Sequence, residues 1–161
     1  MATRRHFLKS LATAGVAALA VPAVAMNVRG ANDRIRVGMV GLGGRMRSHI
    51  GSLTVLKDSD NVEIAAICDC DQSKLDSAVK SYPDLEGLKL KSYNDQRRLF
   101  EDKDIDAVSF STQDHWHALQ TVWACQAGKD VYVEKPPTWC IWEGRQMVKA
   151  ARKYGRMVQI G

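Results

Sequence analysis

The chain has 161 residues, of which 45% are apolar and 25% charged, and its formal net charge is +5. This composition is typical of an ordinary globular protein, and the length favours one folded domain rather than two. Much of the positive charge belongs to the first 25 residues, and the remainder holds no basic run of the kind that binds nucleic acid, so we expect no nucleic-acid partner.

The first 25 residues have the pattern of a twin-arginine export signal. The stretch "TRRHFLK" contains Arg4 and Arg5, an uncharged run follows it, and the segment closes on the small residues "AVA". The apolar run is about 15 residues long, short of the roughly 20 that span a bilayer, so we expect no stable membrane anchor. We expect cleavage after Ala25 following passage through the twin-arginine export machinery, and a periplasmic or otherwise exported location. Removing this segment lowers the formal charge from +5 to +2.

Beyond a linker at residues 26–33, short β-branched runs alternate with stretches of helical periodicity. Strands are predicted at residues 35–40, 62–68, 88–92, 107–110, 130–134 and 156–161. Helices are predicted at residues 45–56, from Asp71 through Tyr82, at 95–100, from Asp114 to Gly128, and at 141–154 with Gly155 just past the end. Six strands joined by five helical crossovers predict an α/β fold of the Rossmann type, a doubly wound parallel sheet, over residues 34–161.

Two of these helices have sequence signals for their starts and their buried faces. Asp71 and Asp114 are placed to cap the helices that they begin. The predicted inward faces are Leu75, Ala78, Val79 and Tyr82 in the first helix, and Ala118, Leu119, Val122 and Cys125 in the second.

The stretch "VGMVGLGGRMRSHI", residues 37–50, resembles a dinucleotide-binding loop. Gly41 permits the tight turn after the first strand, and Gly43 lacks a side chain that would hold a pyrophosphate away from the backbone. The helix that follows offers free N–H groups and a partial positive charge to phosphates. The predicted cofactor-binding residues of this loop are Gly41, Leu42, Gly43, Gly44, Arg45, which adds a cation, and Met46.

Met46 stands where this type of loop usually has its third glycine. It lies in helical register with Ile50 and Leu53, so it is expected to point toward the sheet, where a glycine would let helix and sheet approach closely. Overfilling a packed site typically costs about 1 to 3 kcal/mol, and methionine is an adaptable side chain for such a gap. We therefore predict a displaced helix and weakened cofactor binding rather than a lost site.

Asp69 ends the second predicted strand and supplies the carboxylate that such sites use. A carboxylate there accepts hydrogen bonds from the hydroxyls of an adenosine ribose and repels a 2′-phosphate, so NAD is the expected cofactor and NADP the less favoured one. The alternative is that Asp69 only starts a turn. Lys74 lies close enough in the sequence to leave NADP open.

No metal site is expected from the cysteines and histidines. Cys68, Cys70, Cys125 and Cys140 include one C-x-C pair, but no second pair completes a zinc site. His115 and His117 are two residues apart and do not share a helix face, which favours a polar helix start over a metal site.

Three further stretches, "STQDHWHA", "AGKDVYVEKPP" and "GRMVQIG", together with the glycine loop and "AICDCD", resemble the N-terminal domain of the Gfo/Idh/MocA oxidoreductases. The resemblance implies that Lys135 of the Glu134-Lys135-Pro136 motif lies between nicotinamide and substrate, with a bond before the proline that is commonly cis. An ammonium group at Lys135 would hydrogen-bond the substrate hydroxyl and stabilise charge on its oxygen as hydride leaves, so Lys135 is the catalytic candidate. The alternative is an idle surface lysine in a turn.

The resemblance also implies roles for residues around the fourth strand. It implies that Ser111 and Thr112 bind the nicotinamide half of the cofactor. The other cofactor-binding residues that it implies are His117, in the first turn of the next helix, Glu134 and Lys135. The proline usual in this motif is Gln113 here, which frees a backbone N–H and is expected to loosen the turn. Asp114 is a helix cap or a catalytic group.

Members of this family continue into a second domain that carries substrate specificity, so we expect the chain to be a fragment that is inactive alone. The leading hypothesis is the NAD-binding domain of an exported oxidoreductase that transfers hydride between NAD and a sugar, polyol or related carbohydrate. An NAD-dependent glycosidase and a non-catalytic nucleotide-binding module are the alternatives, and the intact Glu-Lys-Pro motif favours the dehydrogenase. Trp116, Trp139 and Trp142 are candidates to contact the second domain or a partner subunit in a homo-oligomer.

Overall fold

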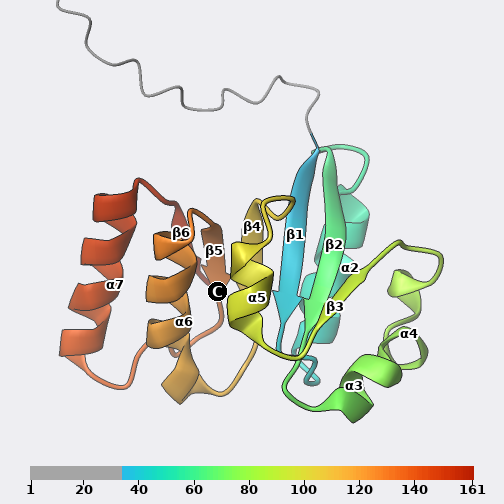
Figure 1. The fold of residues 1–161 in the computed structure, drawn as a ribbon, viewed down its shortest axis with the longest axis horizontal. Helices are drawn as coiled ribbons and strands as arrows, with labels where there is room; N and C mark the ends of the chain where they lie inside the picture. The colour runs from blue at the N-terminus through green and yellow to red at the C-terminus, as the bar shows by residue number, and fades with distance from the viewer. Residues whose placement is uncertain (1–33) are drawn as a thin grey trace, which may run out of the picture. The chain divides into compact units, whose positions relative to one another are not determined.

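In the described part of the chain, six strands lie side by side in one parallel sheet (Figure 1). The computed structural model describes residues 34–161, so the predicted signal and linker fall outside the described residues. The strands are β1 (Ile35–Val40), β2 (Val62–Cys68), β3 (Lys91–Tyr93), β4 (Ala107–Phe110), β5 (Asp130–Val133) and β6 (Val158–Ile160). Their order is β3-β2-β1-β4-β5-β6, and every neighbouring pair is parallel. This order confirms the predicted doubly wound fold.

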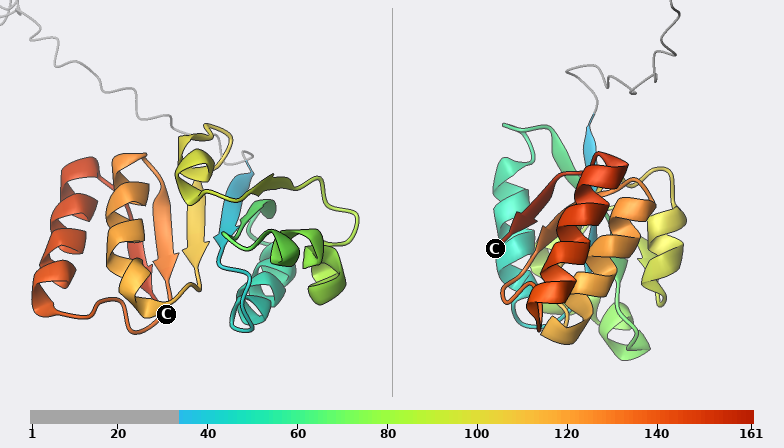
Figure 2. Two further views of the ribbon diagram at one scale, coloured as in Figure 1. Left: turned by 60° about the horizontal axis from the view of Figure 1, so that its bottom comes forward. Right: turned by 90° about the vertical axis from the view of Figure 1, so that its left-hand side faces the viewer.

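Helices cover both faces of the sheet (Figure 2). The connections from β1 to β3 pack on one face, and those from β3 to β6 on the other. The first face carries α2 (Met46–Leu56), α3 (Gln72–Asp76), α4 (Ala78–Ser81) and the single 3₁₀ turn η1 (Pro83–Leu85). The second face carries α5 (Gln96–Glu101), α6 (Asp114–Gln126) and α7 (Ile141–Tyr154), which ends at Gly155 with φ 61°. None of these helices is long and apolar enough to cross a bilayer.

Met46 lies fully buried in the apolar layer between α2 and the sheet. It packs in one cluster with Met39, Leu42 and Ile50, and Leu53 is partly buried against the same cluster. The side chain therefore points toward the sheet, as its register with Ile50 and Leu53 predicts. The predicted displacement of the helix and its effect on cofactor affinity stay predictions.

The segment after β2 is broken where one continuous helix was predicted. Asp71 caps it as predicted, because its carboxylate accepts the N–H of Ser73. The helix then ends at Ser77, which has φ −97° and ψ 5°, and whose hydroxyl donates to the carbonyl of Ser73 at 2.7 Å. Serine side chains that bond back to the preceding turn compete with helix continuation. As a result Val79, predicted to face inward, is 49% exposed.

The third strand is shorter and later than predicted. Only Lys91–Tyr93 pairs with β2, opposite Ala66 to Cys68. Leu88 and Leu90, which suggested a strand beginning at residue 88, instead pack from the preceding loop against the apolar layer of α2. Burial of their side chains explains the apolar run without strand pairing.

Helix α6 differs from the prediction in its cap and in its buried face. Gln113 occupies the N-cap position without a side-chain hydrogen bond, and Asp114 is the first helical residue. The predicted face was partly wrong, because Leu119 is 42% exposed and Val122 is only partly buried. The buried residues of α6 are His117, Ala118, Gln120, Thr121, Ala124 and Cys125. Half of this face is polar, so a count of apolar residues could not locate it.

Candidate functional site

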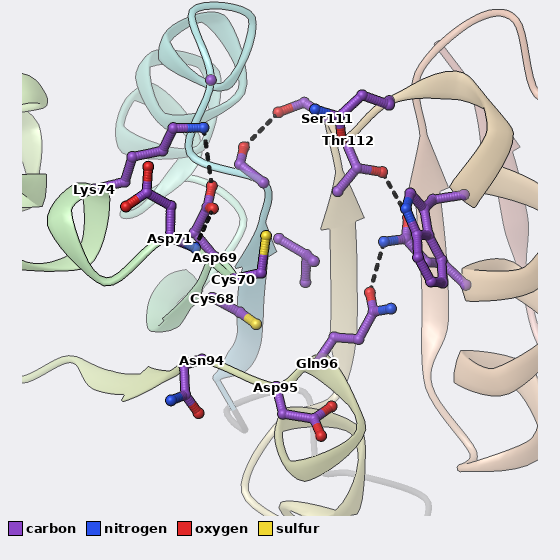
Figure 3. Close-up of a pocket in the computed structure, with 16 residues that line it drawn as sticks. Cys68, Asp69, Cys70, Asp71, Lys74, Asn94, Asp95, Gln96, Ser111 and Thr112 are labelled. Atoms are coloured by element: carbon purple, nitrogen blue, oxygen red, sulfur yellow. Dashed lines mark hydrogen bonds and ion pairs between the residues drawn. The ribbon is translucent and has the colours of Figure 1, made fainter.

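Two adjoining clefts open at the carboxyl ends of the strands, next to the point where the strand order reverses between β1 and β4. The first cleft has a volume of about 650 Å³ and lies against the glycine loop and the end of β2 (Figure 3). The second has a volume of about 490 Å³ and lies against the end of β5. Ser111 and Thr112 line both clefts, so one elongated ligand can occupy the two together. Ligands bind at this place in doubly wound sheets.

Gly41 joins the loops that form the first cleft. Its φ is +88°, a backbone conformation that side chains with a Cβ rarely adopt. A Cβ on Gly41 would lie 2.7 Å from Thr112 Cγ2 and 2.9 Å from Thr112 N, too close for any residue except glycine. The carbonyl of Gly41 accepts the hydroxyl of Ser111 at 2.8 Å. The tight turn predicted at Gly41 therefore also sets the distance between the ends of β1 and β4.

The rest of the glycine loop fits a pyrophosphate. A Cβ built on Gly43 or Gly44 meets no atom within 4 Å, so the backbone there faces open space. Among residues 34–161, the amide N–H groups of Gly43, Gly44 and Arg45 have no hydrogen-bond acceptor. Free amides ahead of a helix bind anions well. The residues present thus fit the phosphates of a dinucleotide.

Asp69 lies at the end of β2 and lines the first cleft beside the glycine loop. Its side chain is buried, with one oxygen accepting the N–H of Leu42 at 2.7 Å and the other accepting the N–H of Asp71 at 3.0 Å. The ammonium of Lys74 lies 3.6 Å from the first oxygen and also lines the cleft (Figure 3). Asp69 is therefore both a brace for the glycine loop and an acceptor at the cleft wall.

The second cleft brings Lys135, His117 and Glu134 together with Arg45 and Asp114. Lys135 is exposed, and the bond from it to Pro136 is cis, as the resemblance implies. The indole of Trp139 and the N–H of His115 hydrogen-bond the carboxylate of Asp114 and lower its pKa. The cleft therefore presents a cation from Lys135 near an ionised carboxylate.

Glu134 is a buried carboxylate behind Lys135. One of its oxygens accepts hydrogen bonds from Arg45 Nε and, at 2.9 Å, from His49 Nε2, while the other accepts the N–H of Lys135 at 3.2 Å. Burial raises the pKa of Glu134, but these hydrogen bonds outweigh burial and lower the pKa to about 2. Arg45 is therefore held on the side of the second cleft, whereas the sequence alone placed its charge at the phosphates.

Sequence reasoning missed the buried polar residues that support both clefts. His49 of α2 contacts Glu134 and, at 2.7 Å, the hydroxyl of Ser109. On the other face Gln120 accepts the hydroxyl of Thr112 at 2.7 Å and donates to Gln96 at 2.6 Å (Figure 3). His49 follows Met46 by three positions and falls within the inward face of α2. A polar residue at such a position is a signal that was available in the sequence.

The four cysteines are not paired with one another. All four are free thiols, with Cys68 and Cys125 buried and Cys70 and Cys140 exposed. Burial raises the pKa of Cys68 to about 12, which keeps this thiol protonated at neutral pH. In the described part of the chain no group of three or more metal-ligating side chains comes together.

Comparisons with known proteins agree with the fold. Residues 35–161 match the family model described as Gfo/Idh/MocA, an oxidoreductase family with an NAD-binding Rossmann fold. The chain belongs to the Gfo/Idh/MocA oxidoreductase family. It comprises the NAD-binding Rossmann domain of that family.

Individual relatives of this Gfo/Idh/MocA domain have different named activities. A glycosyl hydrolase family 109 protein of Shewanella pealeana is 34% identical over 172 residues, covering 93% of this chain and 37% of the relative. An inositol 2-dehydrogenase of Salmonella typhimurium is 32% identical over 128 residues, covering 79% of this chain and 36% of the relative. The chain spans little more than a third of the length of these curated relatives.

A solved structure with the same fold contains the cofactor. The WlbA dehydrogenase from Bordetella pertussis, in complex with NADH and UDP-GlcNAcA, has a TM-score of 0.70 and 26% sequence identity. The match covers 82% of this chain and 36% of that chain.

Replacing Glu134 tests its pKa in the folded protein. We expect Glu134→Gln to lower the free energy of unfolding at pH 7 by on the order of 2 kcal/mol, because a carboxylate with a depressed pKa stabilises the folded state. The folded-state pKa of about 2 lies below the ordinary 4.5, so this stabilisation is present above pH 4.5 and is lost as the pH falls toward 2. Urea unfolding of both proteins across this range measures the difference.

The control for this experiment is Glu101→Gln, at an exposed position of α5. It should leave stability within about 0.5 kcal/mol of the unchanged protein. A stability difference for Glu134→Gln that is the same at every pH would contradict the depressed pKa.

Proposed function

We propose that this chain is the NAD-binding part of an oxidoreductase that transfers hydride between NAD and a sugar, a polyol or a related carbohydrate. The observation that carries the proposal is the pair of clefts joined at Ser111 and Thr112. One cleft offers free amides and a carboxylate, and the other offers the ammonium group of Lys135. A dinucleotide that lies across both would have its reactive ring beside Lys135.

The residues of the chain have distinct tasks in this proposal. The amides of Gly43, Gly44 and Arg45 bind the pyrophosphate, and Asp69 accepts hydrogen bonds from the adenosine ribose. NAD, when bound, supplies the hydride acceptor or donor. Lys135 donates a hydrogen bond to the substrate oxygen and stabilises the negative charge that develops there, while a second domain of the kind that the resemblance implies holds the rest of the substrate.

Relatives support a carbohydrate-like substrate. The matched Salmonella relative is named inositol 2-dehydrogenase, and the structure of the Bordetella enzyme contains UDP-GlcNAcA. Both named compounds carry ring hydroxyls next to C–H bonds, which is the chemistry that hydride transfer requires. A cation beside the reactive ring would stabilise the negative charge that develops on the substrate oxygen as the hydroxyl becomes a carbonyl.

A glycosidase is the second candidate. The glycosyl hydrolase family 109 relative matches 93% of this chain, against 79% for the inositol dehydrogenase. In that reaction the sugar would be oxidised transiently, the leaving group would be eliminated, water would add in its place, and the same hydride would return to the sugar. Lys135 would then serve the oxidation and the reduction alike.

An activity assay of the full-length protein separates the two candidates. Incubation with NAD⁺ and a panel of polyols, beginning with myo-inositol, should form NADH in a net reaction, followed by absorbance. Lys135→Met should lower kcat by about 10²-fold, as loss of a charge-stabilising donor typically does. Release of nitrophenol from a nitrophenyl glycoside without net formation of NADH would replace the dehydrogenase with the glycosidase. If the full-length protein shows neither activity, the remaining candidate is the non-catalytic nucleotide-binding module.

We also propose that NAD is preferred over NADP, because the carboxylate of Asp69 repels a 2′-phosphate. Asp69→Asn keeps an oxygen for the N–H of Leu42 but loses the charge, so we expect NADH affinity to fall about tenfold while NADPH affinity falls less or rises. Calorimetric titration with both cofactors measures the ratio. Asp84→Asn, at an exposed position of η1, is the matched control. Tighter binding of NADPH than of NADH by the unchanged chain would overturn this preference.

Export by the twin-arginine route is a further part of the proposal. It is supported by "TRRHFLK" and by the 93% coverage of the Shewanella relative, which exceeds what residues 35–161 supply and so includes part of the N-terminal segment. Changing Arg4 and Arg5 to lysine should retain the protein in the cytoplasm of a host with this export system, as followed by cell fractionation. Unchanged delivery to the periplasm would exclude this signal.

A further inference from the structure

Lys135 is flanked on both sides by residues that contact a buried histidine. Before it, the carboxylate of Glu134 accepts the Nε2–H of His49 at 2.9 Å. After it, the carbonyl oxygen of Pro136 lies 2.8 Å from Nδ1 of His117. His49 is 7% exposed and His117 is 2% exposed. The residues on either side of Lys135 are therefore tied to the protein interior, Glu134 through its side chain and Pro136 through its backbone carbonyl.

The second nitrogen of each ring contacts the same neighbouring segment, β4 and the loop that follows it. Nδ1 of His49 lies 2.7 Å from the hydroxyl of Ser109, and Nε2 of His117 lies 3.1 Å from the carbonyl oxygen of Thr112. His49 comes from α2 and His117 from α6, which cover opposite faces of the sheet (Figure 2). The two rings thus bridge β4 to the segment around Lys135 from opposite faces.

The hydrogen-bonding partners of each ring decide which of its nitrogens donates and which accepts. The hydroxyl of Ser109 donates to the free nitrogen of His49 while the other nitrogen donates to Glu134, so a neutral ring satisfies both contacts. His117 has a carbonyl oxygen at each nitrogen, so a ring protonated on both nitrogens satisfies both contacts and a neutral ring satisfies one. A buried apolar ring of similar size would fill either site without linking the two segments.

We propose that His49 and His117 are positioning residues for Lys135: they hold the segment 134–136 at a fixed distance from β4, so that the lysine lies beside the reactive ring of the cofactor. This proposal rests on the proposed role of Lys135 in hydride transfer. It assigns both histidines to the orientation of a neighbouring residue, and His117 to this task rather than to direct contact with the cofactor.

Two probes separate positioning of Lys135 from general support of the fold. NADH carries the nicotinamide ring, whereas ADP-ribose has both riboses and the pyrophosphate but no nicotinamide, so a change confined to contacts with the nicotinamide ring affects NADH only. The variants are Lys135→Met, His49→Phe, His117→Phe and each histidine change combined with Lys135→Met. Calorimetry gives the affinity of the full chain for each probe, and circular dichroism verifies the fold.

We expect Lys135→Met to weaken NADH binding about tenfold and each histidine change alone about fivefold, with ADP-ribose affinity unchanged. Each double variant should bind NADH no more weakly than Lys135→Met alone, because a histidine that acts only by positioning Lys135 contributes nothing once the lysine is gone. His115→Phe, at the exposed histidine of α6, is the matched control and should bind both probes as the unchanged chain does.

Additive losses in the double variants, or equal losses of NADH and ADP-ribose affinity in the single ones, would overturn the positioning role. If a phenylalanine variant fails to fold, His49→Gln or His117→Gln replaces it, because glutamine keeps a side-chain donor. The same single and double variants are then compared, and the same results support or overturn the positioning role. If Lys135→Met itself leaves NADH affinity unchanged, the proposed role of Lys135 beside the cofactor is wrong. That result differs from one in which Lys135→Met weakens NADH binding but the histidine variants do not.

Discussion

The carboxyl ends of β1, β2 and β4 meet at Gly41, and the whole site depends on this junction. The N–H of Gly41 donates to the carbonyl of Cys68 at the end of β2, and its carbonyl accepts the hydroxyl of Ser111 after β4. A side chain at this position would collide with the backbone of Thr112 at less than 3 Å. A single residue without a Cβ thus lets three strand ends converge, and both clefts are lined by the segments that it brings together.

Once the three strand ends converge, side chains hold the glycine loop open from either side. Asp69 accepts the N–H of Leu42, and the hydroxyl of Tyr82 donates to the carbonyl of Gly43 at 2.9 Å. These two bonds use a donor and an acceptor of the loop but leave the amides of Gly43 and Gly44 without partners among the described residues. Preorganised free amides bind a phosphate without a further ordering cost. The loop is therefore rigid where it is braced and open where an anion would bind.

The alternation of strands and helices could be predicted because the buried strands are rich in apolar and β-branched residues, which a linear sequence displays directly. The shorter elements could not, because their geometry depends on polar bonds between residues distant in the chain. The inward face of α6 is half polar because His117 and Gln120 bond to loops after β4, and no periodicity reports such partners. The glycine loop and Asp69 could be singled out because they directly follow strands in the sequence, whereas Lys135 was singled out by the resemblance to the family, and all three line the clefts. His49 was missed because its partners, Ser109 and Glu134, lie 60 and 85 residues away.

Glu134 connects the two ends of the proposed cofactor site through one carboxylate. Its first oxygen holds Arg45, which directly follows the free amides of the glycine loop, and its second holds the N–H of Lys135 in the other cleft. Because both oxygens belong to one planar group, a rotation that improves one set of contacts disturbs the other. His49 limits that rotation by donating to the oxygen that Arg45 also uses. The phosphate end and the reactive end of the site are therefore linked through the one buried carboxylate of Glu134, which pairs with the half-exposed guanidinium of Arg45, rather than supported independently.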